Sequence, residues 1–356
     1  MNNSTTFTKE HTYITKGILV LMMLMHHIFT SNLVEQYSIN ITMTNQSLFL
    51  YVCTFFKICI SGFAFLTAFG ITHSFNNLSS SSPNDYLKLV CRRLIGLISN
   101  IFIIYVLAIL YKRFVIKESI RELYDCGNGF NIIYMSIDSL GLAQYFDTPT
   151  INVTWWYLTY AILLIVAMPY IYMAYKKFRY LLLPAGCLLS LIILQNTVMF
   201  STLLPSVLLG VAFAYEGWFE KIHNFTSNIY IKLLRICTEV IGLIISYHVY
   251  RAVSLTYSYI FAFLIPLLVF ELICYIPILN NTLKFIGKHA TNIFLTHTFI
   301  YFYFYTDFIF SFTKDWLILL VLTVICLLVS ICIEILKKAS GYNLLIQKIH
   351  IFLKIK

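Results

Sequence analysis

Residues 316–336 read WLILLVLTVICLLVSICIEIL, an apolar run whose one charged side chain is Glu334. A run of about 20 apolar residues is long enough to cross a bilayer as one helix. Similar runs, separated by polar or charged clusters, fill most of the chain. We predict ten transmembrane helices, near residues 12–32, 48–72, 87–111, 153–175, 180–196, 200–217, 232–250, 256–279, 289–310 and 316–336. Prolines interrupt the fifth and sixth runs, so whether residues 180–217 hold two full spans is left open.

The composition of the 356-residue chain agrees with these runs. Hydrophobic residues make up 60% of the sequence and charged residues 11%, and the mean hydropathy is +0.81. A soluble domain has about a quarter of its residues charged, so the composition excludes a soluble enzyme or a DNA-binding protein. We predict an all-α, polytopic integral membrane protein that forms a single domain over residues 1–356.

Basic residues are distributed unevenly between the two sides of the predicted bundle. With the N-terminus inside, 18 of the 25 Lys and Arg lie on inner segments, six lie on outer segments, and Lys57 lies within a span. Cytoplasmic loops of membrane proteins show this bias. We therefore predict a plasma-membrane protein with both termini in the cytoplasm. The same bias explains the net charge of +10, so no nucleic-acid partner is predicted.

The longest segment between predicted spans is 112–152, on the outer side. Its apolar part contains Asp138 and is too polar for a span, so we expect an interfacial or re-entrant cap. The nine cysteines show neither a disulfide framework nor the spacing of metal ligands, and no metal site is predicted.

Ionisable residues at mid-span are costly, so the first span is informative. Lys16 and His27 are 11 residues apart, which returns to within about 20° of the same helix face and raises His27 about 16 Å above Lys16, near mid-membrane. His26 lies about 80° around the helix from the face that Lys16 and His27 share. This pattern predicts a groove lined by Lys16 and His27. The alternative is a Lys that extends to the interface and histidines that hydrogen-bond between helices.

The second span contains Lys57 near mid-depth, and packing alone explains such a residue poorly. Ser61 follows one turn later on the same face, and Gly62 permits close approach of a ligand or another helix.

Further candidates lie in three other predicted spans. Arg92 and Arg93 open the third span, and arginine suits phosphate binding, although positive-inside statistics also explain their sign. Trp155 and Trp156 open the fourth span and are typical of an interfacial aromatic belt. His297 lies near mid-depth in the ninth span, where hydrogen bonding in the core is the default interpretation.

The order of these elements resembles that of the bacterial membrane-bound family-3 acyltransferases over nearly the whole chain. The resemblance rests on five stretches, Lys16-Gly17-Ile-Leu with His27, Ser61-Gly62-Phe63, Arg92-Arg93, Trp155-Trp156-Tyr157, and Gly287-Lys288-His289 with His297. It implies a ten-helix enzyme that moves an acyl group, usually acetyl, from cytoplasmic acyl-CoA to a hydroxyl of a sugar, a surface polysaccharide or a lipid-linked glycan.

The resemblance also assigns roles. His27 matches the position regarded as catalytic, and Lys16 stands where the family usually has arginine, which weakens bidentate phosphate recognition. A further arginine common in the family is replaced by Ile95. We expect His27 to act as general base, Lys57 or Ser61 to stabilise the oxyanion, and Lys16, Arg92 and Arg93 to bind the phosphates of acyl-CoA.

The remaining candidates, His26, Gly62, Trp155, Trp156 and His297, are expected to contact substrate. A covalent acyl-histidine route stays open beside direct transfer. So do a homo-oligomer and a separate extracytoplasmic partner protein.

A transporter or flippase for a glycan or small metabolite is the alternative function, since it would use the same intramembrane charges as a proton relay. A non-catalytic scaffold ranks third, because it leaves Lys57 and His27 without a role. Inverted repeats would favour a transporter, and the two halves show no matching pair of interrupted helices.

Overall fold

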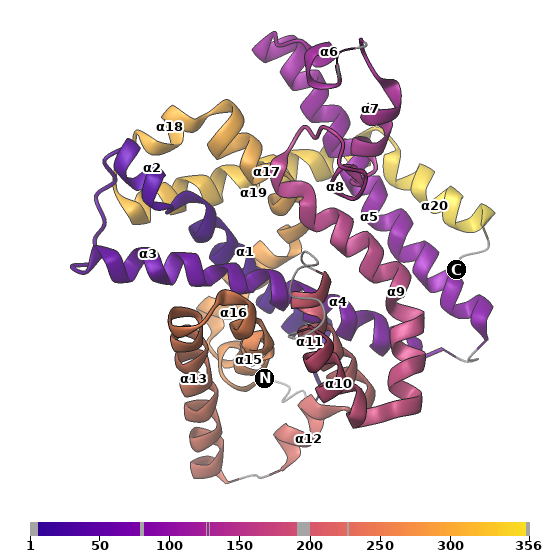
Figure 1. Cartoon of the computed structure of the whole chain (residues 1–356), viewed down its shortest axis with the longest axis vertical. Helices are drawn as coiled ribbons and strands as arrows, with labels where there is room; N and C mark the ends of the chain where they lie inside the picture. Colours follow the sequence, from indigo (N-terminus) through magenta and orange to yellow (C-terminus); the bar gives the residue numbers. More distant parts are fainter. Residues whose placement is uncertain are drawn as a thin grey trace. The chain divides into compact units, whose positions relative to one another are not determined.

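The computed structural model describes residues 6–78, 82–125, 127, 129–190, 200–225 and 228–353. Most of these residues are helical. The β-structure among them consists of two isolated β-bridges, Asn40 with Lys314 and Asp125 with Phe130. The predicted all-α class is therefore confirmed for the described part of the chain (Figure 1).

The chain divides into two compact units, of which the first comprises Met1–Ser79, Met168–Ala290 and Thr313–Leu319. Within it, α11 packs against α4, and α1 packs against α16, α4 and α15. The described helices that lie wholly in this unit are α1 (Lys9–Ile28), α2 (Ser31–Gln36), α3 (Gln46–Phe55), α4 (Cys59–Asn76), α10 (Leu182–Leu188), α11 (Phe200–Glu216), α12 (Trp218–Asn224), α13 (Ile229–Ala252), α14 (Leu255–Ser258), α15 (Leu264–Glu271) and α16 (Pro277–Lys288).

The second unit comprises Ser80–Ala167, Thr291–Phe312 and Leu320–Lys356. It contains most of α17 (Ala290–Thr298) and α19 (Asp315–Ala339) and the first half of α9 (Trp156–Phe178). Its other helices among the described residues are α5 (Pro83–Tyr111), α6 (Ile120–Leu123), α7 (Ile132–Ser139), α8 (Ala143–Phe146), α18 (Thr306–Phe310) and α20 (Tyr342–Phe352). The single domain predicted from the sequence stays a prediction.

Helices α1 and α16 cross at two glycines. A Cβ atom at Gly17 would overlap the main-chain oxygen of Leu283, and one at Gly287 would overlap that of Tyr13. Only glycine allows two helix backbones to approach this closely. The pair therefore fixes how the helix that carries Lys16 and His27 packs in its unit.

We expect the replacement of Gly287 by alanine to destabilise the protein by about 1–3 kcal/mol, because the added methyl group pushes two packed backbones apart. Thermal unfolding in detergent should show a lower Tm. Gly70→Ala is the matched control, since its Cβ would meet nothing within 4 Å and alanine is the better helix former. Equal Tm values for the two variants would contradict the close crossing.

Five helical segments are long and apolar enough to cross a membrane, namely Gln46–Asn76, Pro83–Ile116, Val153–Leu188, Leu255–Tyr275 and Asp315–Ala339. A sixth arises if Thr202–Glu216 and Trp218–Asn224, bent by 64° at their junction, form one broken span. The described residues thus contain five or six candidate spans, and the predicted number of about ten is not confirmed.

Particular elements explain part of this difference. Helix α1 has 20 residues but contains Lys16 and three histidines. The predicted spans 153–175 and 180–196 coincide largely with one continuous helical segment, Val153–Leu188, while residues 191–199 lie outside the described part. In the predicted span 289–310, α17 continues through a π-helical turn only to Phe304, and the five-residue α18 follows separately.

Residues 112–152, the cap, follow α5 and precede α9. A π-helical turn at Lys112–Ile116 is followed by the short helices α6, α7 and α8, and Figure 1 shows α6 and α7 at the C-terminal end of α5. Asn131 caps α7 by accepting hydrogen bonds from the amides of Ile133 and Tyr134. The cap therefore consists of several short helical turns, and of its helices α6, α7 and α8 only α7 has a side-chain cap.

Candidate active site

Helix α1 carries three of the predicted site residues, Lys16, His26 and His27, and all three are half-buried. The two imidazole rings are 5.1 Å apart. His26 Nδ1 lies 3.2 Å from the main-chain oxygen of Cys53, and because a carbonyl only accepts, Nδ1 donates. This bond holds His26 against α3.

Lys57 lies in a 3₁₀ turn, η1 (Phe56–Ile58), that joins α3 to α4 and packs against α1. It follows by one helical turn Cys53, whose main-chain oxygen accepts the hydrogen bond from His26. The structure therefore places the turn that contains Lys57 against the helix that carries the two histidines. Sequence reasoning missed the 3₁₀ turn, a distortion that often occurs at functional positions within longer helices.

Ser61 and Gly62 lie at helix contacts. The Ser61 side chain is fully buried, and its Oγ is 2.5 Å from Ser206 Oγ and 2.8 Å from the main-chain oxygen of Tyr259. A Cβ at Gly62 would collide with the side chain of Leu19 on α1. The Ser61 hydroxyl thus joins α4 to α11 and η6 (Tyr259–Phe263), and the stabilisation of an oxyanion by Ser61 stays a prediction.

Arg92 and Arg93 lie on α5 in the second unit, and both are exposed. Ser82 caps this helix by accepting a hydrogen bond from the Asp85 amide, and Pro83 occupies the first turn, as expected for a helix start. Because Lys16 belongs to the other unit, a shared phosphate site for Lys16 and the two arginines stays a prediction.

His297 is completely buried in the second unit. Its Nδ1 lies 2.8 Å from the oxygen of Phe294 and 3.1 Å from that of Ile293, and its Nε2 lies 3.3 Å from Thr298 Oγ1. Thr298 Oγ1 is in turn 2.8 Å from Thr154 Oγ1. These bonds agree with hydrogen bonding in the core, and substrate contact by His297 stays a prediction.

In a comparison with protein families, the model of the acyltransferase domain of acyltransferase family 3 matches residues 14–335. The chain belongs to acyltransferase family 3. No curated protein and no solved structure matches it. The resemblance noted in the sequence is thus confirmed, and the protein is an acyltransferase with helices apolar enough for a membrane. The transporter alternative loses its support, because the acyltransferase domain covers most of the chain.

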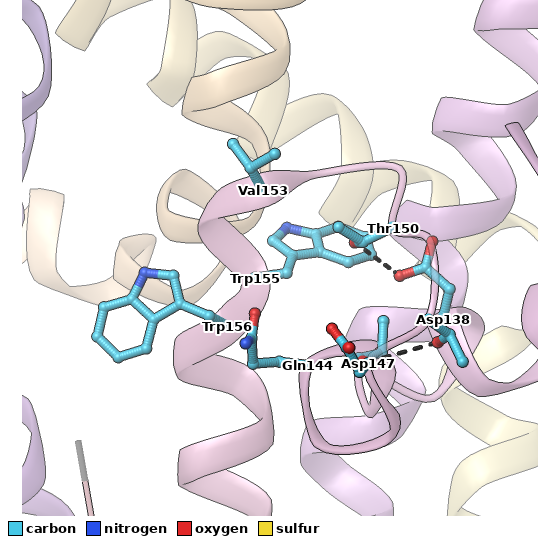
Figure 2. A pocket seen from close by; sticks show the side chains of 10 residues that line it. Asp138, Gln144, Asp147, Thr150, Val153, Trp155 and Trp156 are labelled. Atoms are coloured by element: carbon cyan, nitrogen blue, oxygen red, sulfur yellow. Dashed lines mark hydrogen bonds between the residues drawn. The ribbon is translucent and has the colours of Figure 1, made fainter. Parts of the chain in front are cut away.

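The second unit of this acyltransferase contains a cavity of about 40 Å³ where the cap meets α9. Its polar and aromatic lining includes Asp138, Gln144, Asp147, Thr150, Trp155 and Trp156. Figure 2 shows the Trp155 ring above Gln144 and Asp147, with the Trp156 ring turned away from Asp138.

Asp138 holds the cap of the acyltransferase together. Its Oδ2 accepts hydrogen bonds from Tyr124 Oη at 2.6 Å and from the Ile151 amide at 2.7 Å, and its Oδ1 accepts one from Thr150 Oγ1 at 2.8 Å. Burial raises the pKa of the Asp138 carboxyl, while the three donors act in the opposite direction. Burial and the neighbouring Asp138 carboxyl raise the pKa of Tyr124, so this phenol remains a donor.

The expected aromatic belt is wrong for Trp155. Its side chain is 3% exposed, and its Nε1 donates to the main-chain oxygen of Leu295 at 3.2 Å. Trp156 is half-buried. Sequence reasoning did not single out Gln144, Asp147 or Thr150 at all, because polar residues in a loop ordinarily face solvent. The one feature of the sequence that could have pointed to these three residues is the nearby pair Trp155 and Trp156.

Proposed function

We infer that this acyltransferase moves an acyl group, most simply acetyl, from acyl-CoA to a hydroxyl of a sugar in a surface polysaccharide or lipid-linked glycan. The family match over residues 14–335 supports acyl transfer. The observation that supports the site assignment is the packing of η1, which contains Lys57, against α1, which carries His26 and His27. The predicted orientation places acyl-CoA on the cytoplasmic side of the plasma membrane.

His27 is the proposed general base. A sugar hydroxyl is a weak nucleophile at neutral pH, and a neutral imidazole takes its proton as the oxygen attacks the thioester carbon. Collapse of the tetrahedral intermediate forms the ester and breaks the C–S bond, and the CoA thiolate takes the proton that His27 holds. In the alternative route the His27 nitrogen attacks the thioester carbon, and the C–S bond breaks to release CoA thiolate. The sugar oxygen then attacks the acyl-histidine, the acyl–nitrogen bond breaks, and the hydroxyl proton passes to the freed imidazole.

Lys57 is the proposed oxyanion donor. Its turn, η1, packs against α1, and a cation brought from there to the thioester would stabilise the negative oxygen of the tetrahedral intermediate. The Ser61 hydroxyl is a weaker candidate, since it already bonds within the helix contact with Ser206 and Tyr259.

Arg92 and Arg93 are the proposed phosphate ligands for CoA, with Lys16. They are exposed on α5, and arginine forms strong, paired hydrogen bonds to phosphate oxygens. We expect the double change Arg92→Gln and Arg93→Gln to raise KM for acetyl-CoA at least tenfold, because a charge-assisted hydrogen bond contributes about 1.5–3 kcal/mol. Arg121→Gln is the control, an equally exposed cation on α6. Equal KM values for the double variant and the control would show that Arg92 and Arg93 do not bind the phosphates of acetyl-CoA.

The transfer assay uses the purified full chain in proteoliposomes with acetyl-CoA radiolabelled in its acetyl group. Polysaccharide and lipid-linked glycan extracted from the organism that carries the gene serve as acceptors. The expected result is a radiolabelled glycan that releases acetate in mild alkali, as an ester does. Absence of transfer from acetyl-CoA to every glycan fraction would contradict the proposed donor or acceptor.

A further inference from the structure

We propose that the cavity beside the cap binds one sugar unit of the acceptor, and that this sugar carries no negative charge. The inference rests on the proposed function, because that function supplies the glycan. It depends on the side chains around the cavity, all of which belong to the second unit.

Two polar side chains at the cavity have hydrogen-bonding capacity left over. Gln144 on α8 and Asp147 just after it are exposed, and neither side chain makes a hydrogen bond or ion pair to another described residue. Figure 2 shows both beside Trp155. An amide and a carboxylate together offer donors and acceptors that match vicinal sugar hydroxyls.

The wall of the cavity is rigid. Trp155 is held by its bond to the Leu295 carbonyl and by an edge-on contact with Phe299, whose ring centre is 5.9 Å away. Asp138 and Thr150 are fixed to each other at 2.8 Å. Ligand sites commonly combine such an apolar aromatic wall with a few oriented polar groups.

The cavity has a volume of about 40 Å³ and lies beside exposed side chains. We place one hydroxyl or hydroxymethyl substituent of the sugar inside it. The ring that carries it then rests against the exposed Gln144 and Asp147.

The charge of the lining selects the sugar. Asp138 and Asp147 line the cavity, and none of the described residues that line it is Lys, Arg or His. A carboxylate repels a nearby anion, and more strongly at a protein surface than in bulk water, because the effective dielectric constant is lower there. A uronic acid or a sugar phosphate should therefore bind worse than a neutral or amino sugar.

Binding is tested without donor, on the full chain in detergent, by the change in tryptophan emission on addition of methyl glucoside, methyl N-acetylglucosaminide or methyl glucuronide. We expect saturable binding of at least one neutral glycoside and none of the glucuronide. Asp147→Asn should weaken the neutral glycoside severalfold while keeping the backbone, because Asp147 has φ +50° and asparagine tolerates that conformation.

Gln144→Lys is the decisive second variant, since it places a cation on the exposed side of α8. It should allow the glucuronide to bind. Tyr145→Ala is the control, an exposed neighbour that does not line the cavity, and it should bind as the wild type does. If no neutral glycoside binds, or if all three variants match the wild type, the proposal is overturned. A failure of the proposed function would instead appear as absent transfer from acetyl-CoA.

Discussion

Replacing His27 by alanine should lower the rate of acyl transfer about 10²- to 10⁴-fold, the range that a positioned general base contributes. The loss should appear in kcat, with KM for acetyl-CoA nearly unchanged, because His27 is proposed to act on the sugar hydroxyl and Lys16, Arg92 and Arg93 to bind the donor. The measurement is the initial rate in proteoliposomes, normalised to the amount of inserted protein.

His26→Ala is the matched control in the same helix. Its imidazole donates to the Cys53 carbonyl, so its loss removes one structural hydrogen bond, which contributes about 1 kcal/mol to stability. We expect a lower Tm and a much smaller loss of rate than for His27→Ala. The assignment of His27 is wrong if its alanine variant, correctly inserted, transfers acyl groups at nearly the wild-type rate.

Lys57→Met should lower kcat about 10²- to 10³-fold, the typical loss when one oxyanion donor is removed. Methionine keeps most of the length and apolar volume of the side chain, so packing of the 3₁₀ turn between α3 and α4 should change little. The same proteoliposome assay measures kcat, and circular dichroism with thermal unfolding checks the fold.

Ser61→Ala separates the two candidate oxyanion donors. The Ser61 hydroxyl bonds within a buried helix contact, so its removal should reduce Tm more than it reduces kcat. A kcat loss for Ser61→Ala equal to that for Lys57→Met, at unchanged stability, would transfer the oxyanion role to Ser61. Wild-type kcat in Lys57→Met would exclude Lys57 from the reaction.

The fold class could be predicted from the sequence because it depends on long apolar runs. The run at 316–336 falls within α19, and that at 87–111 falls within α5. Helix breaks were harder to predict. The π-helical turn at Phe299–Phe304 lies in a continuous apolar stretch, and nothing in its residue types distinguishes it from an ordinary helix.

The candidate site was predicted in part. The spacing of Lys16 and His27 identifies the helix face, and the structure adds that the turn containing Lys57 packs against this helix. Periodicity within one helix says nothing about which neighbour it meets. The cavity beside the cap was missed for a similar reason, because Asp138, Gln144 and Trp155 come from three separate short segments.

Mass spectrometry of surface glycans, with and without the gene, tests the proposed acyl transfer to a sugar most directly. We predict that deletion removes the mass of one acyl group per modified sugar. The wild-type gene should restore this mass, and a gene encoding His27→Ala should not. Identical glycan masses in the parent and deletion strains, or full restoration by His27→Ala, would contradict acyl transfer by this site.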